Sequence, residues 1–298
     1  MGEADLWTTA PGGNFDSLIE FPNRGSYGSK PMQPSGVITI TTDFGHKGPF
    51  AAVMKGVILS RFPTARVIDL AHDIPAQWPP EAGFWVSRAY KYFPRGSVHL
   101  AIVDPGVGTE RDILIVDYDG HWFLAPDNGL LALMLDQAAD GHVFKLDIEA
   151  LGRLGIEQPS MTFHGRDIFA PIAAELAAGR TTPVAIGKAT TEWAPAWLDN
   201  PEATASKVTG VIVTVDSFGN LISNIDQALL LEMKEPVVRA AGHTIEMRAT
   251  YGRARPGDYL ALINSFGVLE IARAEGNAAD GLGIERGAPV IVTDGVKT

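Results

Sequence analysis

Hydrophobic and polar positions follow two different periods in the first half of the chain. Short runs of β-branched and apolar residues, typical of buried strands, lie at 37–41, 66–70 and 98–103. Apolar positions at helical spacing lie between them, at 49–61 and 80–93. This alternation predicts a parallel sheet with crossover helices. Further strands are expected near 113–116 and 121–124, and further helices near 130–137 and 168–178.

The pattern changes in the second half, where short apolar runs are separated by Gly, Asn and Asp turns. These runs lie at 208–215, 237–240, 243–248, 259–264, 269–273 and 289–293. Only a short helical pattern at 226–232 interrupts them. Many short strands without long helices predict a small antiparallel sheet or barrel.

Together the two patterns predict an α/β N-terminal domain with a mostly parallel sheet flanked by helices, followed by a small antiparallel β domain. Residues 1–35 are rich in Gly, Pro, Ser and Asn without a sustained period, and we expect a flexible extension there. The α/β domain is then expected at 36–185, a linker at 186–206 and the β domain at 207–298.

Composition excludes several kinds of chemistry. The 298 residues include 24 Lys and Arg against 35 Asp and Glu, a net charge of −11, which disfavours nucleic-acid binding. With no cysteine, the chain has neither disulfides nor a thiol nucleophile, and Cys-ligated metal centres are excluded. No apolar run approaches 18 residues and the first residues lack a secretory pattern, so we expect a cytoplasmic protein without membrane attachment.

Four polar loops accompany the strands of the first half, where open α/β sheets gather their ligands: 41–45, 104–111, 125–131 and 162–171. In the first, Asp43 could hold the two hydroxyls of a ribose, bind a metal ion or cap the next helix. In the second, Asp104 and Arg111 bracket two glycines, and an ion pair that merely closes the loop is the alternative to a functional role. Arg111 stands where a dinucleotide fingerprint needs its third glycine, so that motif is excluded.

The other loops leave similar choices open. Asp127 and Asn128 form a turn and either could cap a helix. His164 precedes a helix start that Asp167 could cap, and it is either functional or a surface residue. His72-Asp73 resembles a pair found in metal phosphohydrolases, but no further His or Asp lies at ligand spacing, so no metal site is expected.

Two polar segments in the second half also follow apolar strands. They comprise residues 215–220 and 263–267. Each could be a simple hairpin turn, and taken alone neither indicates a ligand.

Taken in order, five motifs resemble a single family. They are Thr-Thr-Asp-Phe-Gly at 41–45, Met-Lys-Gly at 54–56, Asp-Pro-Gly-Val-Gly-Thr-Glu-Arg at 104–111, Pro-Asp-Asn-Gly-Leu at 126–130 and Thr-Phe-His-Gly-Arg-Asp at 162–167. The chain resembles the S-adenosylmethionine (SAM) hydroxide adenosyltransferases, or SAM hydrolases, which share a superfamily with the SAM-dependent fluorinase and chlorinase. The resemblance runs from about residue 37 to the C-terminus and leaves out the stretch near 190–205.

The resemblance implies an enzyme that hydrolyses SAM to adenosine and L-methionine, by in-line attack of an activated water or hydroxide on the ribose C5′. It implies neither cofactor nor metal, because SAM is the substrate. It also implies a homotrimer whose sites form between the first domain of one subunit and the second domain of its neighbour.

The resemblance also implies residue roles. Asp104, Arg111 and His164 would handle the water, with Arg111 keeping Asp104 ionised and His164 neutral. Which group takes the water's proton stays open at this stage. The implied substrate contacts are Asp43 to the ribose, Asp216 to the methionine ammonium, Phe218 and Asn220 to the adenine, Ser265 to the methionine carboxylate, the backbone near Ala279 to the adenine edge, and Trp78 packing on the ligand.

The sequence departs from the family's pattern in two places, and two alternative functions are open. Phe266 stands where related halogenases carry Arg, and the loop around Trp78 is one residue longer. A halogenase is one alternative, but the charge of Asp104 beside the line of attack would repel a halide. A SAM- or adenosine-binding protein without catalysis is the other, and it would not need Asp104, Arg111 and His164 together.

Overall fold

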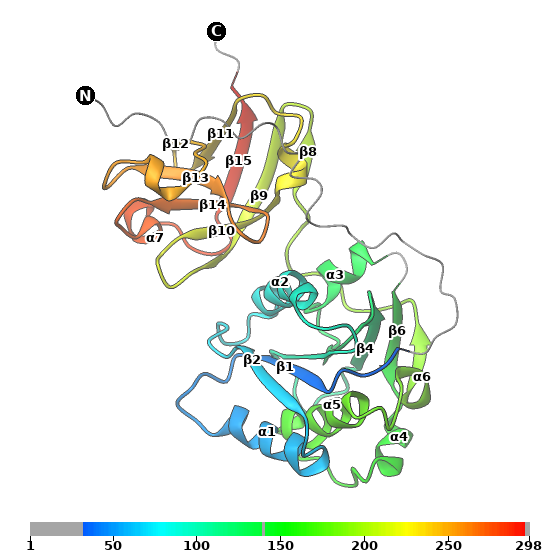
Figure 1. Cartoon of the computed structure of the whole chain (residues 1–298). Helices are drawn as coiled ribbons and strands as arrows, with labels where there is room; N and C mark the ends of the chain where they lie inside the picture. Colours follow the sequence, from blue (N-terminus) through cyan, green and yellow to red (C-terminus); the bar gives the residue numbers. More distant parts are fainter. Residues whose placement is uncertain (1–31, 139–140, 296–298) are drawn as a thin grey trace, which may run out of the picture. The chain divides into compact units, whose positions relative to one another are not determined.

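The computed structural model describes residues 32–138 and 141–295 (Figure 1). The predicted extension 1–35 therefore lies outside the described residues except for its last four. Within the described part, Ser35 already belongs to the fold, because its N–H donates to the Gly96 carbonyl at 3.0 Å.

The first sheet has seven strands in the order β2-β1-β3-β5-β4-β6-β7. Their bounds are β2 (Arg66–Ala71), β1 (Val37–Thr42), β3 (Val98–Ile102), β5 (His121–Pro126), β4 (Ile113–Tyr118), β6 (His142–Leu146) and β7 (Gly187–Thr190). The first four pair in parallel and the remaining pairings are antiparallel. The sheet is thus mixed, and the expectation of a mostly parallel sheet is confirmed only for that first part.

A tight turn explains the antiparallel half. Asp119 and Gly120 join β4 to β5, and both have positive φ angles, 47° and 73°. Two consecutive left-handed residues form the type of turn that connects a β-hairpin, so β4 must run back along β5.

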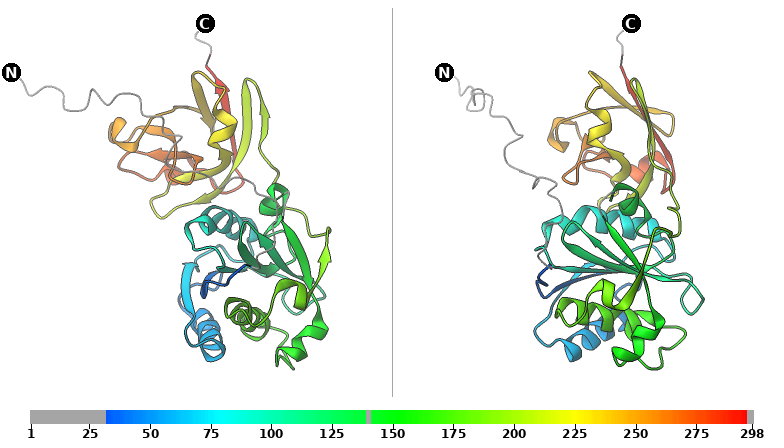
Figure 2. Two further views of the ribbon diagram at one scale, coloured as in Figure 1. Left: turned by 45° about the vertical axis from the view of Figure 1, so that its right-hand side comes forward. Right: turned by 90° about the vertical axis from the view of Figure 1, so that its right-hand side faces the viewer.

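Helices lie on both faces of this sheet. Figures 1 and 2 show α2 (Pro79–Ala89) and α3 (Ala132–Gln137) on one side, with α1 (Phe50–Arg61), α4 (Ile148–Arg153) and α5 (Ala170–Ala177) on the other. Tyr90–Tyr92 continue α2 as a 3₁₀ turn, and the short α6 (Pro183–Ile186) leads into β7. No described helix is long and apolar enough to cross a membrane.

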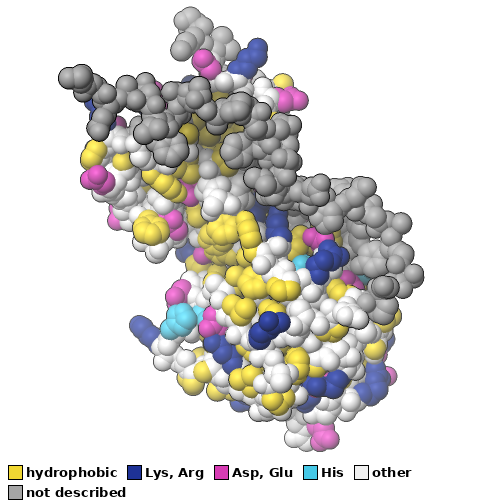
Figure 3. Space-filling view, viewed as in Figure 1, with side chains coloured by type: hydrophobic (Ala, Val, Ile, Leu, Met, Phe, Trp, Pro, Cys, Tyr) yellow, Lys and Arg dark blue, Asp and Glu magenta, His cyan; other side chains and the backbone are white. Residues whose placement is uncertain are grey.

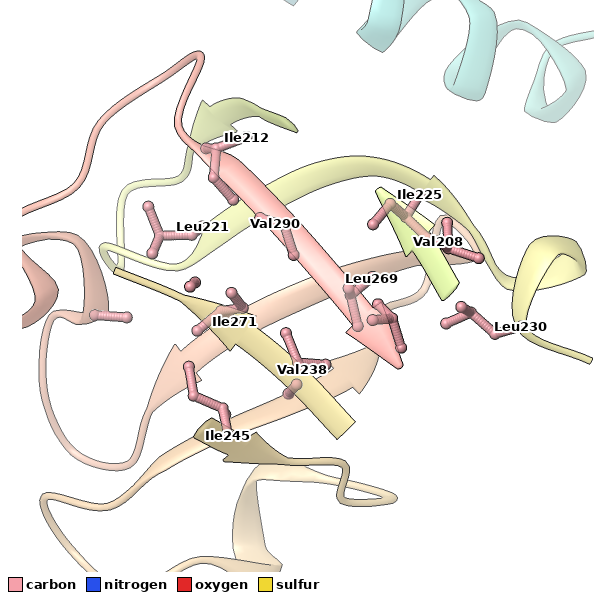
Figure 4. Packing of buried hydrophobic residues seen from close by; sticks show 14 of the residues in the cluster. Val208, Ile212, Leu221, Ile225, Leu230, Val238, Ile245, Leu269, Ile271 and Val290 are labelled. Carbon is pink, nitrogen blue, oxygen red and sulfur yellow. The ribbon is translucent and has the colours of Figure 1, made fainter. Parts of the chain in front are cut away.

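The second sheet is antiparallel and nearly closed. Its order is β12-β11-β15-β9-β10-β14-β13, with β8 attached to β9. The bounds are β8 (Glu202–Thr204), β9 (Lys207–Val215), β10 (Leu221–Asp226), β11 (Pro236–Ala240), β12 (His243–Glu246), β13 (Tyr259–Ile263), β14 (Val268–Arg273) and β15 (Pro289–Asp294). A single parallel bridge links Met247, just after β12, to Ala261 of β13, and the enclosed core is apolar (Figure 4).

The hydrophobic pattern does not predict β10. Its register shifts against both neighbours, and it carries the buried polar residues Ser223 and Asn224. Shifted register and buried polar side chains remove the simple alternation that signals a strand. The helix expected at 226–232 is a 3₁₀ turn at Gln227–Leu230.

The stretch predicted to be a linker, 186–206, contains β7 at its start and β8 near its end. Each of these edge strands belongs to a different sheet. Helix α2 also connects the two sheets, since Phe84 packs with Val213, Ile222 and Val268. The exact domain boundaries stay predictions.

Candidate active site

Asp104 and Arg111 form a buried ion pair just after β3. The Arg111 Nε donates to Oδ1 and Oδ2 of Asp104 at 3.0 and 2.9 Å, and Nη2 also donates to Oδ2. The two side chains are 5% and 10% exposed, respectively. The pair closes the loop 104–111, as the structural interpretation expected, and the same guanidinium also reaches a third residue.

That third residue is His164, whose Nδ1 lies 3.0 Å from Nη2 of Arg111. A guanidinium carries only donors, so Nδ1 must accept, and the proton of the neutral ring is on Nε2. Partial burial lowers the pKa of His164, and the positive charge of Arg111 lowers it further. The structure therefore brings together the three residues expected to handle water, with a neutral imidazole.

A π-helical turn places His164. Gly165–Phe169 form this turn directly before α5, a feature often found at functional sites. Gly165 is buried, and a Cβ there would lie 3.1 Å from Sδ of Met54. Asp167 does not cap α5: its Oδ2 accepts from the N–H of Ser160 at 2.9 Å.

Asp43 and Trp78 are linked through the backbone. The Asp43 Oδ2 accepts from the N–H of Gln77 at 3.0 Å, and Gln77 has a φ of 60°. Asp43 does not cap α1, whose N-cap is Pro49. Trp78 lies 5.9 Å from Trp197, centroid to centroid and edge to face, while its Nε1 is buried without a partner among the described residues.

Asp127 and Asn128 have structural roles. The Asn128 Nδ2 donates to the Val103 carbonyl at 2.8 Å, which holds the third loop beside the second. Asp127 Oδ1 accepts from the N–H of Ala194 at 2.7 Å.

A second group of predicted residues gathers in the β domain. Oδ1 of Asp216 accepts from the N–H of Phe218 and of Asn220, both at 2.9 Å, and its Oδ2 accepts from Nδ2 of Asn220 at 3.0 Å. The Gly219 carbonyl accepts from Ala279 at 3.0 Å. Phe218 itself is 77% exposed, so its ring is available for stacking.

Ser265 lies apart, exposed in the turn between β13 and β14. Asn264 shapes that turn by accepting from the N–H of Phe266 at 3.0 Å. No hydrogen bond or ion pair between described residues joins the group around Asp104 to the group around Asp216. The structure thus assembles each half of the predicted site without linking the halves.

The sequence motifs predict no functional role for Gln77, Trp197 or His72. The positive φ of Gln77 has no sequence signal, and Trp197 lies outside the motifs. The His72 ring bonds to Thr42 and Asp69. Across residues 32–138 and 141–295, no group of three or more His, Cys, Asp or Glu is arranged to hold a metal ion.

Comparison with known families gives two consecutive matches along the chain. The N-terminal domain of the SAM hydroxide adenosyltransferases matches residues 38–187, and their C-terminal domain matches residues 210–291.

Individual relatives support the match to this family. A protein named (R)-S-adenosyl-L-methionine hydrolase from Salinispora tropica is 37% identical over 89% of this chain and 100% of its own length. A protein of the same name from Thermus thermophilus is 36% identical over 84% of this chain and 96% of its own length. A fluorinase of Actinopolyspora mzabensis is 24% identical, covering 86% and 97%. An uncharacterized conserved protein from Thermotoga maritima has a similar structure, with a TM-score of 0.79, 31% identity and coverage of 86% and 99%.

Proposed function

Because this chain belongs to the SAM hydroxide adenosyltransferase family, we propose that it hydrolyses SAM to adenosine and L-methionine. The observation that carries the proposal is the Asp104–Arg111–His164 set, in which a buried ion pair contacts a partly buried imidazole. A protein that only bound SAM would have no use for a neutral imidazole held against an ion pair.

The reaction is a single displacement. A water oxygen attacks the ribose C5′ in line with the carbon–sulfur bond. The C5′–O bond forms while the C5′–S bond breaks, and its electron pair leaves with sulfur as the neutral thioether of methionine. Because the leaving group is neutral, it needs no general acid, and the protein must only orient one water and accept its proton.

The hydrogen bonds of the set favour one proton acceptor. His164 already accepts from Arg111 at Nδ1 and carries its proton on Nε2, so neither nitrogen is free to take another. The Asp104 carboxylate retains lone pairs beyond its bonds to Arg111. We therefore assign proton acceptance to Asp104, and orientation of the water through Nε2–H to His164.

The remaining contacts are proposed from the family's motif. Asp43 would hold the ribose hydroxyls, since Gln77 fixes only one of its oxygens. Trp78 would pack on the ligand. The other contacts come from the β domain: Asp216 to the ammonium, Phe218 and Asn220 to adenine, Ser265 to the carboxylate and the backbone at Ala279 to the adenine edge.

A homotrimer would unite the two halves of the site across subunit interfaces. Two observations support this: the halves are unlinked within one chain, and α1 and β2 expose the large apolar side chains of Phe50, Leu59 and Ile68. Apolar side chains also gather beside α2 on the face in Figure 3. A cytoplasmic location stays a prediction.

The test is chromatography of the products formed from each sulfur epimer of SAM, with and without excess chloride. From the epimer that is hydrolysed, we expect adenosine and methionine both with and without chloride. A 5′-chloro product that requires chloride would instead identify a halogenase, and bound but unchanged SAM would identify a binding protein.

Two substitutions of His164 test its assigned role. His164→Gln keeps an N–H near the position of Nε2 and is expected to retain turnover within about tenfold of the parent, while His164→Ala loses about 100-fold. Asp104→Asn is expected to abolish turnover. If His164→Gln is as inactive as His164→Ala while Asp104→Asn remains active, the proton roles are reversed.

A further inference from the structure

A chain of hydrogen bonds adjoins Asp43 and runs from the buried Thr42 and His72 to Asp69, which is exposed. His72 Nδ1 is 2.7 Å from Oγ1 of Thr42, and His72 Nε2 is 2.8 Å from Oδ1 of Asp69. Lys55 Nζ completes the chain by donating to Oδ2 of Asp69 at 2.6 Å. The His72 side chain is 1% exposed, so water does not compete for its bond to Thr42, whereas the Asp69 side chain is 41% exposed.

The donors and acceptors of this chain fix one another. The Asp69 carboxylate can only accept, so in the neutral His72 ring the proton is on Nε2 and Nδ1 is the acceptor. Nδ1 must then receive the hydroxyl proton of Thr42. That leaves the lone pairs of the Thr42 oxygen for the N–H of Phe44, at 3.3 Å.

The members are a hydroxyl, an imidazole and a carboxylate, as in a nucleophilic triad, but a nucleophile is excluded here. Thr42 is fully buried, and its hydroxyl is occupied on both sides. A substrate carbon could not approach it. These hydrogen bonds can therefore contribute only by fixing the position of the residues that they contact.

These bonds hold the backbone on both sides of Asp43. Thr42 precedes Asp43, and Phe44, which follows, is tied to the Thr42 hydroxyl. One residue further, the N–H of Gly45 donates to the carbonyl of His72 at 2.8 Å. The register of β1 against β2 shifts between Ile40 and Thr41, which brings the end of β2 to this loop.

We propose that Thr42, His72 and Asp69 are positioning residues that aim the Asp43 carboxylate at the ribose hydroxyls of the substrate. This rests on the proposed function, since it assumes that the ligand carries a ribose. The Gln77 N–H also donates to the Asp43 carboxylate, so the loop before Trp78 contributes to its orientation as well.

The test compares three isosteric changes in the same strand. Thr42→Val removes the hydroxyl that bonds His72. Thr41→Val removes an equally buried hydroxyl that has no partner among the described residues. Thr39→Val removes a hydroxyl bonded to another buried histidine, His99, at 2.9 Å. The last two are controls for packing and for the loss of a Thr–His bond.

The measured quantity is the ratio of affinities for adenosine and 2′-deoxyadenosine, together with KM and kcat for SAM. Thr42→Val is expected to reduce that ratio and to raise KM, each by about tenfold, with a smaller change in kcat. Thr41→Val and Thr39→Val are expected to keep the parent's ratio of affinities. This holds for Thr39→Val even if that variant is less thermally stable. Asp43→Asn reduces the ratio as well, and the double variant Asp43→Asn, Thr42→Val adds little to it.

A second pair of variants applies if Thr42→Val does not fold. His72→Asn keeps an acceptor near the position of Nδ1, and His72→Leu removes it. The proposal predicts a higher adenosine preference in His72→Asn than in His72→Leu.

The outcomes separate the inference from the proposed function. If the parent hydrolyses SAM and prefers adenosine, but Thr42→Val keeps that preference, the inference is wrong and the function stands. If the parent does not discriminate between the two nucleosides, the inference is also wrong. If the parent discriminates without hydrolysing SAM, the function fails, and a lost preference in Thr42→Val still supports the inference.

Discussion

Single side chains in this protein fix the protonation state of their neighbours. Arg111 holds Asp104 through three donor contacts and forces Nδ1 of His164 to accept. A second example is buried in the sheet, where Nε2 of His99 lies 3.1 Å from Nδ1 of His121. Burial lowers the pKa of His99 to about 3 and that of His121 to about 4.

These two histidines predict a pH-dependent stability. Both stay neutral in the folded chain, while in the unfolded chain they take up protons below about pH 6.5. The free energy of unfolding therefore falls as pH drops below about 6.5, and His99 alone contributes about 2 kcal/mol of loss at pH 5. Urea unfolding between about pH 7 and pH 5 measures it.

The exposed His243 provides the control for this pH dependence. His243→Gln should leave the dependence of the unfolding free energy on pH unchanged. If the parent protein is equally stable at both pH values, the predicted effect of His99 and His121 is wrong.

At the scale of elements, one turn and one short helix hold several of the residues predicted to contact the substrate. Asp216 organises the turn before β10, and that turn packs on α7 (Ala278–Leu282). Gly219 makes the packing possible: its φ is 82°, and a Cβ there would lie 2.2 Å from the Asn277 side chain. Asn277 in turn caps α7 by accepting from the N–H of Asp280 at 2.9 Å.

Gly219→Ala should disrupt both turn and helix. Gly242→Ala is the matched control, because its φ of 77° is similar but nothing lies within 4 Å of the new Cβ. The control should cost about 1 kcal/mol of backbone strain. Gly219→Ala should cost at least about 2 kcal/mol more and weaken adenosine binding. Equal losses of unfolding free energy in the two variants would show that the contact with Asn277 is unimportant.

At the scale of the whole molecule, the predicted residues form two groups, one beside each sheet. The Asp104 group belongs to the α/β fold and the Asp216 group to the β fold. A closed oligomer with one half-site from each neighbour needs no contact between the groups within one chain.

Complementation tests this arrangement. Asp104→Asn and Asp216→Asn are each expected to be inactive alone. Co-expressed, they should form mixed trimers in which about a quarter of the sites combine two intact halves, so activity returns to about a quarter of the parent level. Asp104→Asn mixed with His164→Ala is the control, because both changes lie in the same half. Inactivity of the first mixture, with mixed oligomers verified by mass, would mean that each site is formed by one chain.

The sequence alone determined the elements with strong periodicity and the motifs at their ends. The strands at 37–41, 66–70 and 98–103 and the change of pattern in the second half all correspond to observed elements. The resemblance of the motifs to a known family pointed to Asp104, Arg111 and His164 as a set, whereas each loop taken alone left a structural alternative open.

Only the tertiary structure decided the rest. The hairpin at Asp119 and Gly120, the shifted register of β10 and the positive φ of Gln77 are backbone geometries set by long-range pairing, which a local pattern does not encode. The tautomer of His164 and the role of His72 depend on partners 53 and 30 residues away in sequence. Hydrogen bonds over such separations are created by the fold, so the sequence could name the chemical groups but not the state in which each is held.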